Sequence, residues 1–163
     1  DTLGDESLAQ RARALTLMGD IAQRRGNLDS ALPRYREAAA STSELLRRHP
    51  DDPERMNDHA QNLFFFGYVA WQRGRTEDAV ASFRQYKRLA ERMVSAEPAR
   101  TAWQLEKIYA NHNLGVVLIE QQSFREAAEL FTNNLGSIDR LVAAEPRNLD
   151  HRLQMTETLA YLA

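Results

Sequence analysis

The four histidines are the side chains of this sequence best suited to bind a metal or to act as a general base; they are His49, His59, His112 and His151. No two of them are four residues apart, the spacing that places two zinc ligands on one helical face, and the HExxH motif is absent. The sequence has no cysteine, which excludes disulfides, thiolate catalysis and cysteine-rich zinc sites. We therefore expect no metal site and no cofactor.

The carboxylates are numerous, but many stand where a helix is predicted to begin, as Asp51, Asp52, Glu77 and Asp78 do. A negative charge at a helix start is stabilised by the helix dipole, which accounts for these residues without acid–base catalysis. No glycine-rich phosphate loop is present, and no serine stands with an evident base and orienting acid. We expect no enzymatic activity and assign no catalytic residue.

Three aromatic residues in the middle of the chain, Phe64, Tyr68 and Trp71, are the strongest candidates for binding a partner. They occupy positions i, i+4 and i+7, so a helix would present them as one stripe. Trp and Tyr often contribute most to protein–protein binding, and such a stripe in a groove can bind an apolar or helical peptide. The alternative is ordinary core packing, which most aromatic stripes at helical spacing serve.

A period of 48 residues runs through the chain and determines how these side chains are positioned. The positions that recur are Gly19, Gly67 and Gly115; Ala31, Ala79 and Ala127; Tyr35, Phe83 and Phe131; and Pro50, Pro98 and Pro146. A glycine inside a helix costs about 0.5–1 kcal/mol relative to alanine, so its recurrence indicates that two helices approach closely there. One helix pair cannot bury its apolar face alone, and we expect the units to stack in tandem.

Apolar residues at helical spacing, interrupted by turn residues, predict seven helices. They cover about residues 1–25, 28–48, 53–73, 76–96, 99–121, 124–144 and 149 onward. We expect Asn27 or Asp29 to cap the second helix, Asp51 or Asp52 the third, and Thr76 the fourth. The 163 residues form one domain in this interpretation, as a fragment of a longer protein. Its repeats span about 2–49, 50–97 and 98–145, with a partial repeat at 146–163.

These residues resemble the tetratricopeptide repeat over the whole chain. The matching positions are Asn113, Leu114, Gly115, Phe124, Ala127 and Phe131 in the third copy, Gly67, Gly74, Ala79 and Phe83 in the second, and Gly19, Gly26, Ala31 and Tyr35 in the first. The period departs from the family value of about 34 residues, so each helix is about two turns longer than usual. Asn111 stands where the family favours a large apolar residue, and Tyr86 and Asn134 stand where it favours alanine.

The resemblance implies a right-handed α-solenoid of antiparallel helix pairs, in which the first helix of each pair lines a concave groove. The partner-binding positions of this sequence would then be Arg13, Asp20 and Arg24; Phe64, Tyr68, Trp71 and Gln72; and Tyr109, His112 and Val116. The charged residues of the first copy could hold a charged peptide end, although a solvated helix face is the simpler interpretation. Long repeats of this kind are similar to those attached to bacterial signalling proteins, where they sense or dock.

The charge balance argues against nucleic acid and membranes as partners. The 21 basic and 23 acidic residues are interspersed and give a net charge of −2. The longest apolar run, Leu63 to Trp71, is far shorter than the ~20 residues of a membrane span. No basic-then-apolar leader opens the sequence, so we expect a cytoplasmic protein; the alternative is a secreted protein whose leader has been cleaved.

We therefore expect a protein-interaction scaffold that binds a peptide or helix of a partner in its concave groove, as the sensing or docking part of a larger signalling protein. The alternative is a structural arm that forms homo-oligomers through residues 149–163. The helix predicted there has no pair, and Leu153, Leu159 and Leu162 would leave an apolar face exposed.

Overall fold

The structure, a computed structural model, describes residues 2–163, and all of its regular structure is helical. The helices are α1 (Thr2–Arg24), α2 (Leu28–Arg48), α3 (Pro53–Gln72), α4 (Thr76–Ala96), α5 (Thr101–Glu120), α6 (Phe124–Ala144) and α7 (Leu149–Ala160). None of the described residues belongs to a β-strand. The all-α prediction is confirmed, and the first six helices lie close to their expected ranges. The last helix was expected to continue to Ala163 but ends at Ala160, where the chain turns.

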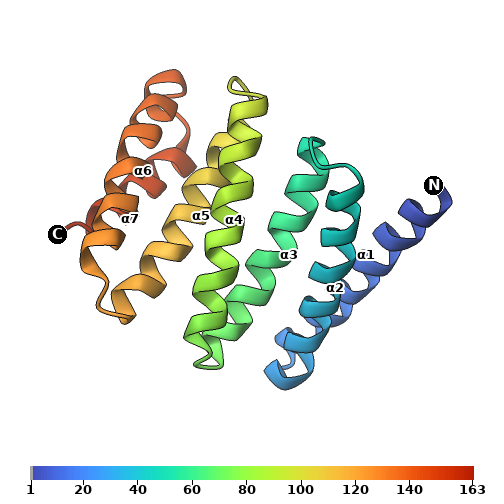
Figure 1. Cartoon of the computed structure of the whole chain (residues 1–163). Coiled ribbons are helices and arrows are strands. Elements are labelled where there is room, and N and C mark those ends of the chain that lie inside the picture. Colours follow the sequence, from blue (N-terminus) through green and yellow to red (C-terminus); the bar gives the residue numbers. More distant parts are fainter. Residues whose placement is uncertain (1) are drawn as a thin grey trace.

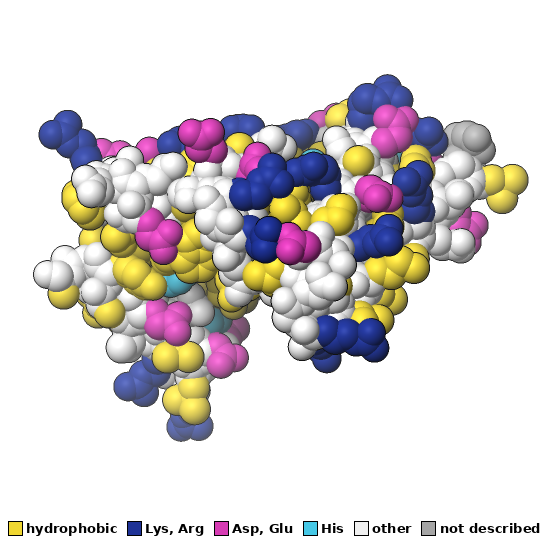
Figure 2. Space-filling model, turned by 90° about the horizontal axis from the view of Figure 1, so that it is seen from below, with side chains coloured by type: hydrophobic (Ala, Val, Ile, Leu, Met, Phe, Trp, Pro, Cys, Tyr) yellow, Lys and Arg dark blue, Asp and Glu magenta, His cyan; other side chains and the backbone are white. Residues whose placement is uncertain are grey.

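Consecutive helices pack against one another along the array and form an α-solenoid. Figure 1 shows two layers, with α2, α4 and α6 in the nearer layer and α1, α3, α5 and α7 in the farther one. Hydrogen bonds join neighbours of the farther layer: Thr16 of α1 donates to Asn62 of α3 (2.8 Å), and Gln61 of α3 donates to Glu106 of α5 (2.9 Å). Figure 2 shows that the molecule is hollowed between its C-terminal helices, at the left, and its N-terminal half.

Each helix pair closes at a glycine that lies against an aromatic ring of the second helix. A Cβ atom on Gly19 would lie 2.7 Å from Cε1 of Tyr35, and one on Gly115 would lie 2.7 Å from Cζ of Phe131. The corresponding distance in the middle pair is 2.9 Å, and all three rings are fully buried. Close contact between the paired helices therefore explains why glycine recurs, as its cost inside a helix predicts.

Two helix starts have the caps that the sequence predicts. Asn27 accepts a hydrogen bond from the backbone N–H of Ser30 (3.0 Å) at the start of α2. Asp52 accepts one from the N–H of Glu54 (2.9 Å), with Pro53 at the first position of α3. Each side chain satisfies an N–H group that the helix itself leaves without a partner.

The fourth helix begins too early for the predicted Thr76 cap, and that prediction is wrong. Thr76 is the first residue of α4, and Arg75 at the cap position makes no side-chain cap bond. The reason is the turn before it, because Gly74 adopts φ 71° and the chain re-enters a helix almost at once. Gly26 (φ 72°) makes the same turn before α2. Gln122 (φ 60°) adopts this conformation before α6, at a cost of about 1–2 kcal/mol for a non-glycine residue.

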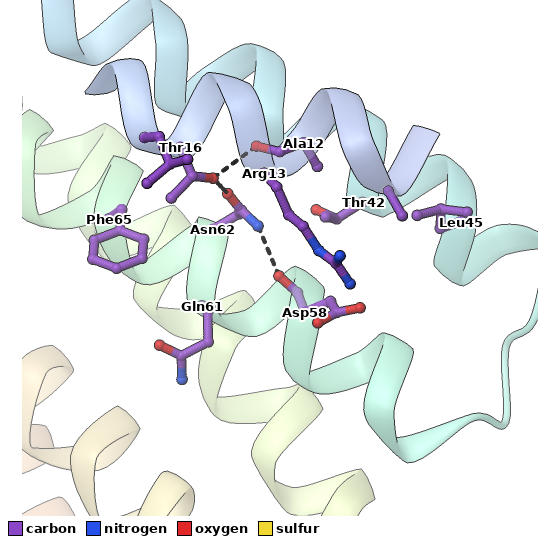
Figure 3. Close-up of a pocket in the computed structure, with 11 residues that line it drawn as sticks. Ala12, Arg13, Thr16, Thr42, Leu45, Asp58, Gln61, Asn62 and Phe65 are labelled. Carbon is purple, nitrogen blue, oxygen red and sulfur yellow. Dashed lines mark hydrogen bonds between the residues drawn. The ribbon is translucent and has the colours of Figure 1, made fainter. Parts of the chain in front are cut away.

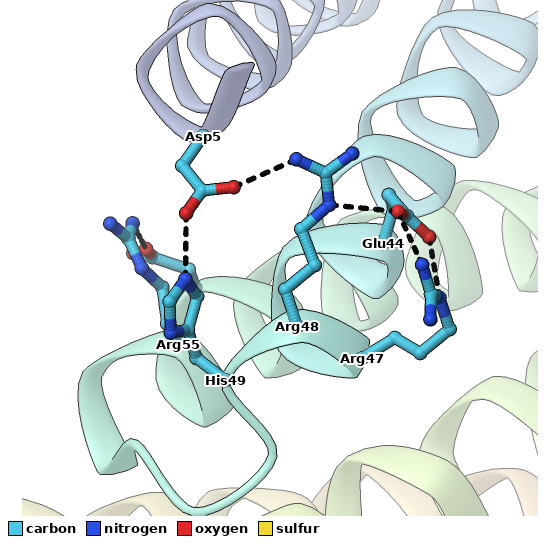
Figure 4. Close-up of polar contacts among 7 residues, drawn as sticks. Asp5, Glu44, Arg47, Arg48, His49 and Arg55 are labelled. Atoms are coloured by element: carbon cyan, nitrogen blue, oxygen red, sulfur yellow. Dashed lines mark hydrogen bonds and ion pairs between the residues drawn. The ribbon is translucent and has the colours of Figure 1, made fainter. Parts of the chain in front are cut away.

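An ionic cluster holds the start of α1 against the end of α2 (Figure 4). Asp5 accepts hydrogen bonds from Nε2 of His49 (2.7 Å) and from Arg48 (2.9 Å), and these bonds hold its pKa below the usual value. Glu44 accepts bonds from Arg47 and Arg48, which lower its pKa to about 2. The cluster adds polar contacts to the packing of α1 on α2.

Candidate partner-binding groove

A cavity of about 390 Å³ opens between α1 and α3, with part of α2 behind it (Figure 3). Its lining residues are Ala9, Ala12, Arg13, Thr16 and Leu17 of α1, Thr42 and Leu45 of α2, and Asp58, Gln61, Asn62 and Phe65 of α3. Most of the surface that it exposes is apolar, and Leu17 at its edge is 62% exposed. Because α1 and α3 belong to different repeats, stacking of the repeats creates this cavity.

Hydrogen bonds connect the polar side chains along the cavity wall, except for Arg13, which has no partner among the described residues. Thr16 donates to Oδ1 of Asn62 (2.8 Å), and Nδ2 of Asn62 donates to the carbonyl of Asp58 (2.8 Å). The side chain of Asp58 pairs with Arg55 (3.3 Å). Arg13 makes no hydrogen bond or ion pair with any residue that the structure describes. An apolar cavity beside a free guanidinium fits an apolar side chain that is followed by a carboxylate.

A second, more open hollow of about 740 Å³ continues along α1 and α3 beyond Phe65. It is lined by Asp20, Gln23, Arg24, Gly26, Leu28, Phe65 and Gln72. Three of the predicted partner-binding residues, Asp20, Arg24 and Gln72, therefore lie around one hollow. Asp20 also accepts a hydrogen bond from the hydroxyl of Tyr35 (2.6 Å), and burial and then this bond raise the pKa of Tyr35. The cavity and the hollow together form the α1–α3 groove.

Phe65 stands at the junction of the two parts of the α1–α3 groove, and sequence reasoning missed it. Its ring stacks on Tyr35, with centroids 5.3 Å and planes 13° apart. The same contact recurs at the C-terminal end, where Tyr161 stacks on Phe131 at 4.9 Å and 4°. In both pairs the aromatic residues are 30 positions apart, so this spacing is the signal that could have found Phe65.

The predicted aromatic stripe lies on α3 towards α5 rather than in the lining of the α1–α3 groove. Phe64 and Tyr68 stack with centroids 5.9 Å apart, and Tyr68 meets Trp71 edge-on at 5.9 Å. Phe64 also approaches the buried ring of Phe83 (6.5 Å), and Trp71 donates from Nε1 to Glu120 of α5 (2.6 Å). All three rings are half-buried, so each contacts the core and also reaches the surface.

The predicted residues of α5 lie at the C-terminal end of the array. The ring of His112 meets Tyr161 (5.3 Å) and Phe131 (5.9 Å) edge-on, and burial lowers the pKa of His112. Val116 packs against the core, and Tyr109 is 37% exposed. The structure therefore divides the ten predicted residues among the α1–α3 groove, the α3 stripe and the C-terminal end.

No three histidine, aspartate or glutamate side chains among residues 2–163 are grouped so that they could hold a metal ion. None of the described helices has both the length and the apolar character needed to cross a membrane.

Comparison with known proteins identifies the type of repeat. Residues 11–51, which include most of α1 and all of α2, match a tetratricopeptide-repeat family model. The crystal structure of the de novo designed helical repeat protein DHR64 is similar, with a TM-score of 0.53 and 16% identity over 97% of this chain and 94% of that one. Residues 11–51 are therefore a tetratricopeptide-type repeat, and the chain as a whole has a helical-repeat fold. The crystal structure of MamA protein gives a TM-score of 0.32 at 12% identity, over 93% of this chain and 88% of that one. No curated protein matches the chain.

The helical array also holds a largely buried carboxylate that sequence reasoning missed, Glu106 of α5. Glu106 accepts hydrogen bonds from the hydroxyl of Tyr86 and from Gln61 (2.9 Å), and so joins α3, α4 and α5. Burial raises the pKa of Glu106 and also that of Tyr86. The equivalent position one repeat earlier is Asp58, so the recurrence of a carboxylate at this register was the available signal.

Replacing Glu106 by leucine should lower the free energy of unfolding by about 1–3 kcal/mol, because the hydroxyl of Tyr86 would stay buried without an acceptor. Adding Tyr86→Phe should recover most of that loss, since the unpaired hydroxyl is then removed. Urea denaturation of the two single variants and the double variant measures the coupling. Strictly additive losses would show that the two groups do not interact.

Proposed function

We propose that this tetratricopeptide-type protein is a scaffold that binds an apolar segment of a partner protein in the α1–α3 groove, a binding rather than a catalytic role. The observation that carries the proposal is the mainly apolar cavity of about 390 Å³ beside Arg13, whose guanidinium has no partner among the described residues. The family likeness supports the broader class of protein-interaction scaffold.

The chemistry of the α1–α3 groove favours a helix or peptide with a large apolar residue and an acidic residue about one turn away. A leucine or phenylalanine side chain would enter the cavity, and a carboxylate would reach Arg13 with a charge-assisted hydrogen bond. Arg24 and Gln72 would then offer polar contacts in the open part of the groove. Tyr68 and Trp71 would extend the binding surface towards α5.

The wider setting of this scaffold rests on the sequence alone. We propose one domain made of repeats 2–49, 50–97 and 98–145 with a partial repeat 146–163, within a longer protein. A role in signalling and a bacterial origin stay predictions from the resemblance, and a cytoplasmic location stays a prediction from the sequence.

A random peptide library displayed on phage tests the proposed groove with the whole chain as bait. The wild-type protein should enrich peptides that share one large apolar and one acidic residue. Leu17→Glu places a charge at the edge of the cavity and should reduce capture of the enriched peptides at least tenfold. Leu17 is highly exposed in the free protein, so the substitution should leave the helical circular dichroism unchanged.

Ile21→Glu is the matched control for this experiment. Ile21 lies one turn further along α1 and is 52% exposed, but it lines neither part of the α1–α3 groove. This variant should capture the enriched peptides as the wild type does. Equal loss in both variants, or no shared motif among the enriched peptides, would contradict the groove as the binding site.

A second candidate function, self-association through residues 149–163, is favoured by exposed leucines on α7. Leu149, Leu153 and Leu159 are 73%, 55% and 49% exposed. The sequence prediction that Leu162 also lacks a partner is wrong, because Leu162 packs against the core beyond the end of α7. The helix itself packs against α6, so the apolar surface left over is smaller than expected.

Sedimentation velocity over a range of protein concentrations tests self-association. If α7 forms an oligomer contact, the wild type should show a concentration-dependent species larger than the monomer, and Leu153→Glu should remove it. A wild-type protein that stays monomeric at every concentration would exclude this second function and leave the groove proposal untouched.

A further inference from the structure

The third helix pair contains two buried asparagines where the family pattern favours apolar residues. Nδ2 of Asn111 donates to Oδ1 of Asn134 (2.9 Å), and Nδ2 of Asn134 donates to the carbonyl of Ile108 (2.9 Å). These bonds fix the orientation of both amides and leave Oδ1 of Asn111 buried with no hydrogen-bond partner in the described chain. Asn111 is only 2% exposed. An unsatisfied buried acceptor costs about 1–3 kcal/mol, so it requires an explanation.

Asn111 lines a polar cavity of about 400 Å³ on the face of the array formed by α4 and α6. The lining residues are Lys87, Glu91, Lys107, Asn111, Thr132, Asn133, Gly136, Ser137 and Arg140. Because α5 lies behind α4 and α6 (Figure 1), its residues form the base of this cavity. The cavity shares no residue with the α1–α3 groove and lies on other helices.

Two positive charges of the cavity have no carboxylate partner among the described residues. Lys87 pairs with Glu91 (2.7 Å), so these two charges cancel. Within the described part of the chain, Arg140 donates only to the hydroxyl of Ser137 (3.2 Å). Lys107 is half-buried and makes no ion pair or hydrogen bond within residues 2–163. A half-buried cation without a counter-ion is costly, and a ligand with two negative charges would match the excess.

Gly136 keeps one side of the cavity open. Apart from the backbone of its own helix and its chain neighbours, no atom of residues 2–163 lies within 4 Å of the place that a Cβ on Gly136 would take. Gly115 differs, because its Cβ would meet Phe131. Helix packing therefore does not explain this glycine, although it costs about 0.5–1 kcal/mol in the interior of α6. The free space lies beside the groups that carry the excess charge.

We propose that this cavity binds a compact dianion that carries a hydroxyl group. Lys107 and Arg140 neutralise its two charges, and its O–H donates the hydrogen bond that Oδ1 of Asn111 lacks. Monohydrogen phosphate and hydroxydicarboxylates share this chemistry. Sulfate and plain dicarboxylates carry the same charge but have no hydroxyl to donate. The site is independent of partner binding in the α1–α3 groove.

Isothermal titration calorimetry of the whole chain at neutral pH tests the site with two matched pairs of probes. Phosphate is compared with sulfate, and malate with succinate. At least one hydroxylated probe should bind, and it should bind at least tenfold more tightly than its counterpart. The pair that shows the preference identifies the source as phosphate or carboxylate. Absence of binding, or equal binding within both pairs, would overturn the proposal.

Substitutions then locate the bound anion. Lys107→Gln should weaken binding about tenfold or more, because a charge-assisted hydrogen bond is lost. Arg92→Gln is the matched control: Arg92 is equivalent to Arg140 one repeat earlier and does not line the cavity, so affinity should not change. If Lys107→Gln and Arg92→Gln weaken binding equally, the anion is held by the general surface charge and the proposal is wrong.

The hydroxyl preference is assigned by a double variant, Asn111→Leu with Asn134→Ala, which restores the residue types that the family favours. It should lose the preference for the hydroxylated probe while it keeps its helical circular dichroism. A preference that persists in this variant would overturn the role of Asn111. Should the double variant not fold, Gly136→Leu fills the cavity from an exposed helix face and should abolish binding; unchanged affinity would refute the site.

Discussion

Truncating Phe131 to alanine should lower the free energy of unfolding by about 3–5 kcal/mol. The ring is fully buried, Tyr161 stacks on it at 4.9 Å, and His112 meets it edge-on. It also fills the space beside Gly115, where α5 and α6 approach. Removing it would leave a void between three helices and take away the surface against which the C-terminal Tyr161 packs. Urea denaturation followed by circular dichroism measures the loss.

Replacing Gly115 by alanine tests whether the ring of Phe131 requires a glycine at this position. Its Cβ would lie 2.7 Å from Cζ of Phe131, so Gly115→Ala should cost about 1–3 kcal/mol. In the Phe131→Ala background the same change should cost much less, since the clash is gone. Gly136→Ala is the matched control and should stabilise the protein by about 0.5–1 kcal/mol. Equal effects at Gly115 and Gly136 would contradict the proposed helix contact.

Lowering the pH from 7 to 4 should cost about 3 kcal/mol of stability through His59 alone. His59 is 8% exposed, and burial lowers its pKa from 6.5 to about 4, with Nδ1 3.0 Å from the hydroxyl of Thr42. The folded state therefore binds the proton less readily than the unfolded state. The stability is fully present above pH 6.5, is lost as the pH falls from 6.5 to 4, and changes no further through this group below 4.

His59→Gln separates this effect from the titration of the carboxylates. Urea denaturation at a series of pH values should show that the variant loses less stability than the wild type, by about 3 kcal/mol between pH 7 and 4. Burial lowers the pKa of His112 as well, so a weaker dependence of the same sign should remain in the variant. Identical slopes for the two proteins would show that His59 is not buried as described.

Most of the fold could be predicted because the residues at the contact between paired helices recur in each repeat. A glycine that recurs every 48 residues, together with a large ring 16 positions later, indicates where each pair closes, and the structure places Gly19 on Tyr35 and Gly115 on Phe131. Turn residues then set the helix ends. Thr76 failed as a cap because the left-handed turn at Gly74 decides where α4 begins, and a capping preference contributes only about 1 kcal/mol.

The candidate site could be predicted less well, because contacts between repeats do not follow from the pattern within one repeat. Phe65 lies one position from the predicted stripe, and only the stacking partner Tyr35 in the preceding repeat shows which way its ring faces. In the sequence Glu106 looks like a surface carboxylate. Only the structure shows that Tyr86 and Gln61 donate hydrogen bonds to it. The stripe residues belong to α3 as expected, but each ring is half-buried because it packs against the core.

Hydrogen–deuterium exchange of the whole chain, with and without the best peptide from the library, tests most directly whether the α1–α3 groove binds the partner. Protection on peptide binding is expected in the middle of α1 and in residues 58–65 of α3, which line the cavity, and little change is expected in α4, α6 and α7. Protection confined to α7, or to the face formed by α4 and α6, would show that the partner binds elsewhere.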